Sequence, residues 1–245
     1  SVKSRGLGDV YKRQLSEFLS PNVNQRTDEW GGSIENRSRL LITTIEAIRD
    51  KVGSNFPISV KLNSSDFQKG GFTHEESIKV ARILNNTSLD LLEISGGTYE
   101  NFTALEMDSF NLKKAKTIKP QRSTRVREAY FLKYAEAIKD VISIPLAVTG
   151  GFRSAEGMNN ALQSGACDVI GLGRPLCSEP DIVNKLISGE KKSATLYENM
   201  LEFGPWILGL NSPISLMRSN NKAAQVYWCY RQILKIADGN EVDTK

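Results

Sequence analysis

Two glycine-rich turns, close together in the chain, constrain what this sequence can fold into more than any other feature. Between Ser143 and Leu176, the apolar runs 144–148 and 169–172 have the length of strands, and each leads into glycines and an arginine. The order is therefore strand, turn, helix, strand, turn. This alternation predicts an α/β fold with a parallel sheet.

Two such turns side by side also suit a phosphate group. The start of a helix presents unpaired N–H groups and a positive dipole end, and glycine lets an anion approach the backbone closely. In a (β/α)8 barrel, the loops after the last two strands form the usual phosphate site. The alternative is that the glycines only turn the chain, but an arginine beside both turns favours the phosphate site. The glycines are Gly150, Gly151, Gly171 and Gly173.

The rest of the chain repeats the same alternation. Strand-like runs cover residues 58–63 and 89–94, and helical spacing of apolar residues predicts helices over 33–53, 74–86, 127–142 and 180–187. The segment 98–127 is a long excursion of the kind that forms lids or binding loops. Four βα units result, which is half of a (β/α)8 barrel.

Composition excludes several classes of protein. The 245 residues are 40% hydrophobic, enough for one domain with a sizeable core, and no apolar run is long enough to span a membrane. Cys167, Cys177 and Cys229 have no metal-ligand spacing, so we expect no metal site and idle thiols in a reducing, cytoplasmic compartment. The net charge of +4 drops to +1 without the first fourteen residues, which leaves no basic stripe for nucleic acid.

Residues 1–14, SVKSRGLGDVYKRQ, have no helical or strand period. DVYKRQ resembles the translation of a transposon end used in preparing sequencing libraries. We interpret residues 1–14 as a sequencing or cloning artefact without fixed structure, and residues 15–245 as the barrel part with a helical tail. The alternative is a natural disordered N-terminus.

Alternation along the strand ISVKLN indicates where chemistry can take place. Its apolar residues share one face, so Lys61 points into the barrel near the carboxyl end of the strand, where barrel active sites are built. The same argument places Glu93 and Thr149 inward. Lys61 has three interpretations: a solvated edge charge, a Schiff-base nucleophile, or a cation facing an anionic cofactor. Residue chemistry alone leaves them open.

Six stretches carry a resemblance to a known family. They are FLSPNVNQRTDEWGGSIENRSRLL, ISVKLNSSDFQKGGFT, LLEISGGTYEN, REAYFLKYAEAI, IPLAVTGGFRSAEGM and CDVIGLGRPL. From about residue 18 to residue 239 the chain resembles the carboxyl-terminal half of the Old Yellow Enzyme family of FMN-dependent NAD(P)H:flavin oxidoreductases and ene-reductases. The resemblance implies an incomplete (β/α)8 TIM barrel, from the end of the fourth strand through the eighth.

The resemblance also implies cofactors and site residues. FMN would be the bound cofactor, NADH or NADPH the reductant, and a small molecule the substrate. Lys61 would lie near flavin N1 and O2, where a positive charge stabilises the anionic reduced flavin. The FMN phosphate would be held by two loops, through Gly150, Gly151, Phe152, Gly173 and Arg174. The RTDEWGGSIENRSR motif is expected to brace a loop and a helix start.

The chain departs from the family at the catalytic positions. The family's substrate-binding His and His/Asn and its proton-donating Tyr would fall on Gly8, Tyr11 and Arg13, where none can play its role. The predicted activity is hydride transfer from NAD(P)H through FMN to an electron-poor alkene, with this truncated chain inactive. Exposed barrel edges would favour a homo-oligomer or self-association. The alternatives are a Schiff-base aldolase using Lys61 and a non-catalytic remnant.

Overall fold

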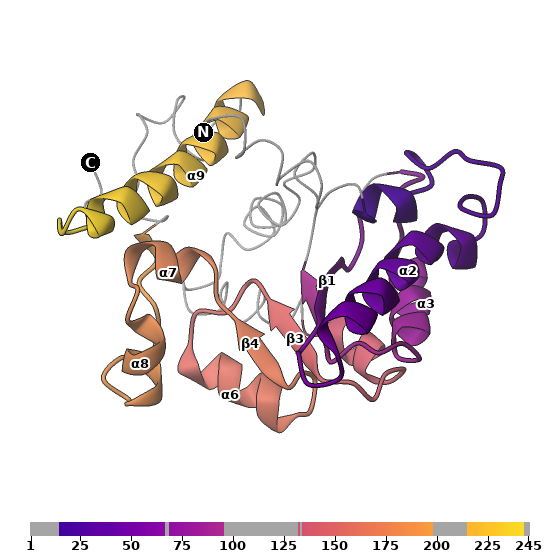
Figure 1. Ribbon diagram of the computed structural model, residues 1–245. Helices are drawn as coiled ribbons and strands as arrows, with labels where there is room; N and C mark the ends of the chain where they lie inside the picture. Colours follow the sequence, from indigo (N-terminus) through magenta and orange to yellow (C-terminus); the bar gives the residue numbers. More distant parts are fainter. Residues whose placement is uncertain (1–14, 67–68, 96–131, 133, 198–214, 243–245) are drawn as a thin grey trace. The chain divides into compact units, whose positions relative to one another are not determined.

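The computed structural model describes residues 15–66, 69–95, 132, 134–197 and 215–242 (Figure 1). The predicted excursion 98–127 and the positions Gly8, Tyr11 and Arg13 lie outside these residues. The chain divides into two compact units, each treated separately below. The first unit comprises Ser1–Ala104, Ala129–Gly150 and Ala161–Ile170; the second comprises Leu105–Glu128, Gly151–Asn160 and Gly171–Lys245.

A parallel sheet forms the centre of the first unit. Its strands follow chain order, β1-β2-β3-β4, and the β1/β2 and β2/β3 pairs are parallel. They span Ser59–Asn63, Leu91–Ser95, Leu146–Thr149 and Val169–Gly171, the last ending at the boundary between the units. The predicted α/β fold with a parallel sheet is therefore confirmed.

The two faces of this sheet differ in character. One face carries apolar side chains that are at most 3% exposed: Leu62, Leu92, Ile94, Leu146 and Val148. Alternate residues point to opposite faces of a strand. The other face therefore presents Ser59 and Lys61, and it is more open to solvent. The predicted alternation along β1 is correct.

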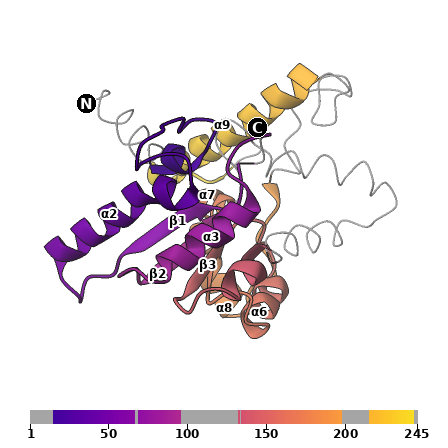
Figure 2. The same ribbon diagram turned by 90° about the vertical axis from the view of Figure 1, so that its right-hand side faces the viewer.

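Helices α2 and α3 lie side by side in both views of the first unit (Figures 1 and 2). Helix α2 spans Ile34–Val52, and the Ser33 hydroxyl accepts the Asn36 N–H at its start. Helix α3 spans His74–Leu84 and begins with a capping box formed by Thr73 and Glu76. Their buried residues complete the core of this unit.

A further helical segment, 134–139, falls within the predicted helix 127–142. Most of the residues that precede it in the predicted helix lie outside the described residues. Tyr134 on this segment packs edge-on against the His74 ring, with centroids 4.3 Å apart. The His74 imidazole also hydrogen-bonds with the backbone of Ser64, just after β1. His74 therefore joins α3, a strand end and this helix.

The second unit contains mostly helices. Helix α6, Ala155–Gln163, begins in it, and α7, Arg174–Ser178, contacts the long α9, Ser215–Ala237. Helix α8, Ile182–Ile187, confirms the helix predicted over 180–187. On α9, Trp228 is buried and stacks with Tyr197 at 5.6 Å, whereas Tyr227 is exposed. Within the described residues, no helix has the length and apolar character to cross a membrane.

Candidate functional site

Lys61 and Glu93 form an ion pair on the open face of the sheet. They are register partners on β1 and β2, and the Lys61 ammonium contacts Glu93 Oε1. The Lys61 side chain is 52% exposed and that of Glu93 27%. As predicted, both side chains lie on the face opposite the buried apolar residues, and the pair lies in the middle of β1 and β2.

Thr149, at the end of β3, extends this cluster to a third strand. Its side chain hydrogen-bonds with the Glu93 carboxylate. Burial raises the pKa of Glu93, but the hydrogen bonds from Lys61 and Thr149 outweigh burial and leave this pKa below its usual range. Three neighbouring strands therefore each contribute one polar group to the same face, with Glu93 in the middle.

A Schiff-base lysine is activated by burial in an apolar pocket or by a neighbouring cation. Lys61 is half-exposed and bonded to a carboxylate, which is the opposite environment. The geometry therefore favours the interpretation of Lys61 as a cation over that of a nucleophile.

The first glycine-rich turn follows β3 and requires its glycines. Gly150 has φ 125° and Gly151 has φ 80°, a region that other residues adopt only with strain. The next side chain, Phe152, is 1% exposed and belongs to the core. Only the backbone of Phe152 could therefore meet a phosphate, which refines its predicted role.

A strap formed by residues 191–195 pairs with residues 153–155, which follow this turn. An isolated antiparallel bridge joins Ser154 to Ser193, and the Ala194 N–H donates to the Arg153 carbonyl at 2.8 Å. The buried Glu179 carboxylate accepts from the Thr195 N–H at 2.8 Å and pairs with Lys191. Sequence reasoning missed this strap, because no local pattern signals contacts between segments so far apart.

The second glycine-rich turn leads into α7. Gly173 has φ −110° and ψ −86°, so its backbone does not demand glycine. A Cβ built there would meet no heavy atom within 4 Å among the described residues. Arg174 is the first residue of α7 and is followed by Pro175. Glycine at this position leaves room beside an arginine at a helix start.

The donor set fits the chemistry of FMN. Positive-φ glycines and an arginine at a helix start suit its phosphate, and Lys61 suits the electron-rich N1 and O2 side of its ring. Gly151, Phe152, Gly173 and Arg174 belong to the second unit, whereas Lys61 and Gly150 belong to the first. The structure thus provides two groups of candidate ligands, one in each unit.

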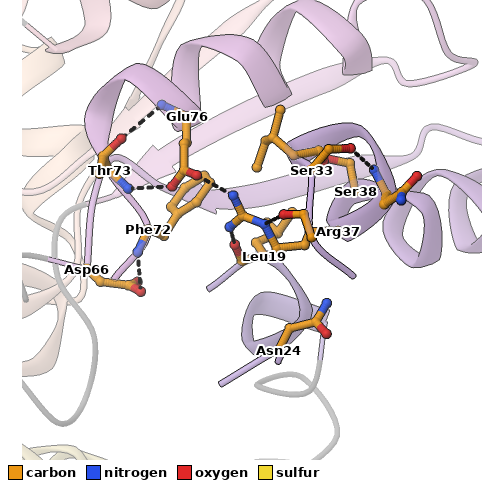
Figure 3. Close-up of polar contacts among 12 residues, drawn as sticks. Leu19, Asn24, Ser33, Arg37, Ser38, Asp66, Phe72, Thr73 and Glu76 are labelled. Carbon is orange, nitrogen blue, oxygen red and sulfur yellow. Dashed lines mark hydrogen bonds and ion pairs between the residues drawn. The ribbon is translucent and has the colours of Figure 1, made fainter. Parts of the chain in front are cut away.

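The RTDEWGGSIENRSR motif has a structural role, as predicted. Arg37, 4% exposed, donates to the carbonyls of Leu19 and Gly32 and pairs with Glu76 on α3 (Figure 3). Arg26 pairs with Asp28 in the preceding loop. These charged residues connect the loop to the starts of two helices.

Comparisons with known proteins identify the family of this chain. A family model described as the NADH:flavin oxidoreductase / NADH oxidase family matches residues 14–193, more than half of the chain. The NADH-dependent flavin oxidoreductase nadA of Aspergillus parasiticus is 37% identical over 183 residues, which cover 74% of this chain and 38% of that protein. The chain spans less than half the length of the first three curated relatives it matches.

Solved structures agree in fold. A 2-naphthoyl-CoA reductase in complex with 2-naphthoyl-CoA matches with a TM-score of 0.61 and 27% identity, over 81% of this chain and 28% of that one. The Old Yellow Enzyme homologue of Zymomonas mobilis, 24% identical over 78% of this chain and 48% of its own, has a TM-score of 0.53 and shows the fold alone. From the family match and these likenesses, the chain belongs to the NADH:flavin oxidoreductase / NADH oxidase family, which works with FMN and a nicotinamide reductant.

Proposed function

We propose that the protein containing this chain is an FMN-dependent oxidoreductase that passes hydride from NADH through FMN to an electron-poor alkene. The observation that carries this proposal is the Lys61 ammonium on the open face of the parallel sheet, in the middle of β1. Active sites of barrel enzymes are built at the carboxyl ends of the strands, where Gly150 and Gly151 follow β3. The glycine-rich turns after β3 and β4 supply a second, independent group of candidate ligands.

Each group of residues has a distinct task in this proposal. Gly150 and Gly151 let the FMN phosphate approach the backbone, and Arg174 offers it a planar, permanently charged donor fork. Lys61 would place a positive charge beside flavin N1 and O2. FMN itself supplies the hydride chemistry, while the protein binds, orients and tunes it.

NADH is the proposed reductant because several relatives are named as NADH-dependent. An alkene acceptor rests on the resemblance to ene-reductases. Other relatives carry names such as bilirubin reductase and metal reductase, so the named acceptors differ among the relatives. We also propose a cytoplasmic location, consistent with three free cysteines.

We further propose that this chain corresponds to strands five to eight of the barrel and is inactive alone. In a closed barrel the inner face of the sheet is covered, whereas here the Lys61 side chain remains 52% exposed. The open edge and face would drive self-association. Sedimentation at several protein concentrations and thermal unfolding test the proposed self-association. A stable monomer with a sharp thermal transition contradicts it.

FMN binding is the direct test of the function. The protein containing this chain is titrated with FMN, and the bound flavin is then mixed anaerobically with NADH and with NADPH. We expect stoichiometric binding, bleaching of the oxidised flavin by NADH, and a loss of affinity for reduced FMN in Lys61→Met. Lys51→Met, an exposed lysine at the end of α2, is the matched control. Absence of flavin binding contradicts the proposal.

Borohydride trapping separates the aldolase alternative. A carbonyl compound fixed covalently on Lys61 after reduction would favour the Schiff-base mechanism over the flavin one. No covalent adduct is expected.

A further inference from the structure

We propose that Glu93 is a positioning residue that fixes the Lys61 ammonium at the flavin and offsets part of its charge. The proposal rests on the function proposed above, because it assumes that Lys61 faces FMN. It deepens that function by naming what sets the balance between oxidised and reduced flavin.

The sheet fixes this geometry. Lys61 and Glu93 are partners in the β1/β2 register, so their Cβ atoms point to the same face from adjacent strands. The flexible lysine stem could carry its ammonium in many directions, but the contact with Glu93 Oε1 draws it across to β2. Lys61 is thereby held at a defined position on the sheet.

Glu93 is itself held from the other side. Thr149 on β3 hydrogen-bonds with its carboxylate, so the carboxylate lies between a cation on one strand and a hydroxyl on another. The Glu93 side chain is also the less exposed of the two, with 27% of its surface open to solvent. A carboxylate tied on both sides is a fixed charge, not a mobile surface group.

A fixed carboxylate would change the net charge close to the flavin. A bare ammonium stabilises the negative charge that develops at N1 and O2 on reduction, and it would hold reduced FMN more tightly than oxidised FMN. An ammonium paired with a carboxylate has no net charge, so most of this preference is cancelled. The Lys61–Glu93 pair would therefore hold reduced FMN less tightly than an unpaired Lys61 ammonium would.

The test measures the ratio of the Kd for oxidised FMN to the Kd for reduced FMN in anaerobic titrations of the FMN-binding protein. This ratio reports the flavin's relative stabilisation without any turnover. Lys61→Met is expected to lower the ratio about tenfold, and Glu93→Gln to raise it about tenfold, each near 1.4 kcal/mol. Glu93→Asp, which keeps the charge but withdraws it from Lys61, should raise the ratio less.

Asp90→Asn is the matched control. Asp90 immediately precedes β2, at the opposite end of the strand from the carboxyl edge, and is bonded to Arg49 and the Ile58 N–H. Removing this carboxylate should leave the ratio unchanged, although it should lower stability. Circular dichroism of every variant verifies folding.

The outcomes separate the two proposals. A ratio that Lys61→Met does not change, or no FMN binding at all, overturns the proposed function. A ratio that falls with Lys61→Met but stays within twofold of the unmutated value in Glu93→Gln overturns only the role of Glu93. A fall in Glu93→Gln also overturns it, because the carboxylate would then serve Lys61 without offsetting its charge. If Glu93→Gln does not fold, Glu93→Asp alone decides.

Discussion

Arg37 on α2 forms a nearly buried ion pair with Glu76 on α3, across 39 residues of sequence (Figure 3). Glu76 is also the acidic residue of the α3 capping box, where it accepts from the Thr73 N–H at 3.0 Å. One carboxylate therefore closes the start of α3 and anchors α2. The Arg37 guanidinium also donates to the carbonyl of Leu19. It therefore joins α2, α3 and the segment around Leu19.

Replacing Arg37 by Met should destabilise the protein severely. The change leaves Glu76 and the carbonyls of Leu19 and Gly32 without their donor in a buried setting, at a cost of about 3–5 kcal/mol. Urea unfolding measures it. Arg39→Met, an exposed arginine on the same helix, should cost far less. Equal losses in the two variants would contradict the bracing role of Arg37.

Gly151→Ala should separate backbone strain from loss of binding. At φ 80° an alanine costs about 1–2 kcal/mol, and the strained turn would no longer present its N–H groups to a phosphate. Gly165→Ala imposes the same strain at φ 74°, with open space around the added Cβ. We expect similar losses in thermal stability, but weaker FMN binding only for Gly151→Ala. Equal FMN affinity in both variants would count against a phosphate site.

Glu179→Gln should weaken FMN binding without unfolding the protein. Glu179 anchors the strap through Lys191 and the Thr195 N–H, and the strap pairs with residues 153–155, which directly follow the glycine-rich turn. Losing this carboxylate should let the turn relax and reduce FMN affinity several-fold. Asp181→Asn, which removes an exposed carboxylate paired with Lys185, should leave it unchanged. The prediction fails if both variants bind FMN equally well.

His74 should make stability depend on pH. Burial lowers its pKa below the ordinary 6.5, so the unfolded chain takes up a proton before the folded one. The unfolding free energy should therefore fall as pH falls through about 6.5, and level off below the pKa of the folded state. His74 is the only histidine of the chain, so its NMR titration is unambiguous. His74→Gln should flatten the dependence of the unfolding free energy on pH in this range. An unchanged slope would show that another group causes this dependence.

The sequence predicted those parts of the fold that depend on local pattern. Alternation in ISVKLN located the apolar face of β1 and the opposite direction of Lys61, and the position of Gly150 and Gly151 indicated a turn that needs glycine. The third strand was predicted to start too early. It begins only at Leu146, because Pro145 has no N–H to give to the ladder.

The contacts that hold the site could not be predicted in the same way. Glu179 appeared only as a charge beside a proline, and its partners Lys191 and Thr195 lie 12 and 16 residues further on. Phe152 was assigned to the phosphate loop from its position in the sequence, but its burial depends on packing that no periodicity reveals. The pairing of Glu93 with Lys61 depends on strand register, which only the assembled sheet defines.

The strand order also bears on how the chain acquires its structure during synthesis. Each strand of β1-β2-β3-β4 lies beside the one made just before it, and Lys61 meets its partner Glu93 only 32 residues later. Every pairing in this sheet joins strands that are consecutive along the chain. The sheet can therefore grow by one strand at a time as the chain leaves the ribosome, with the newest strand always forming the next template.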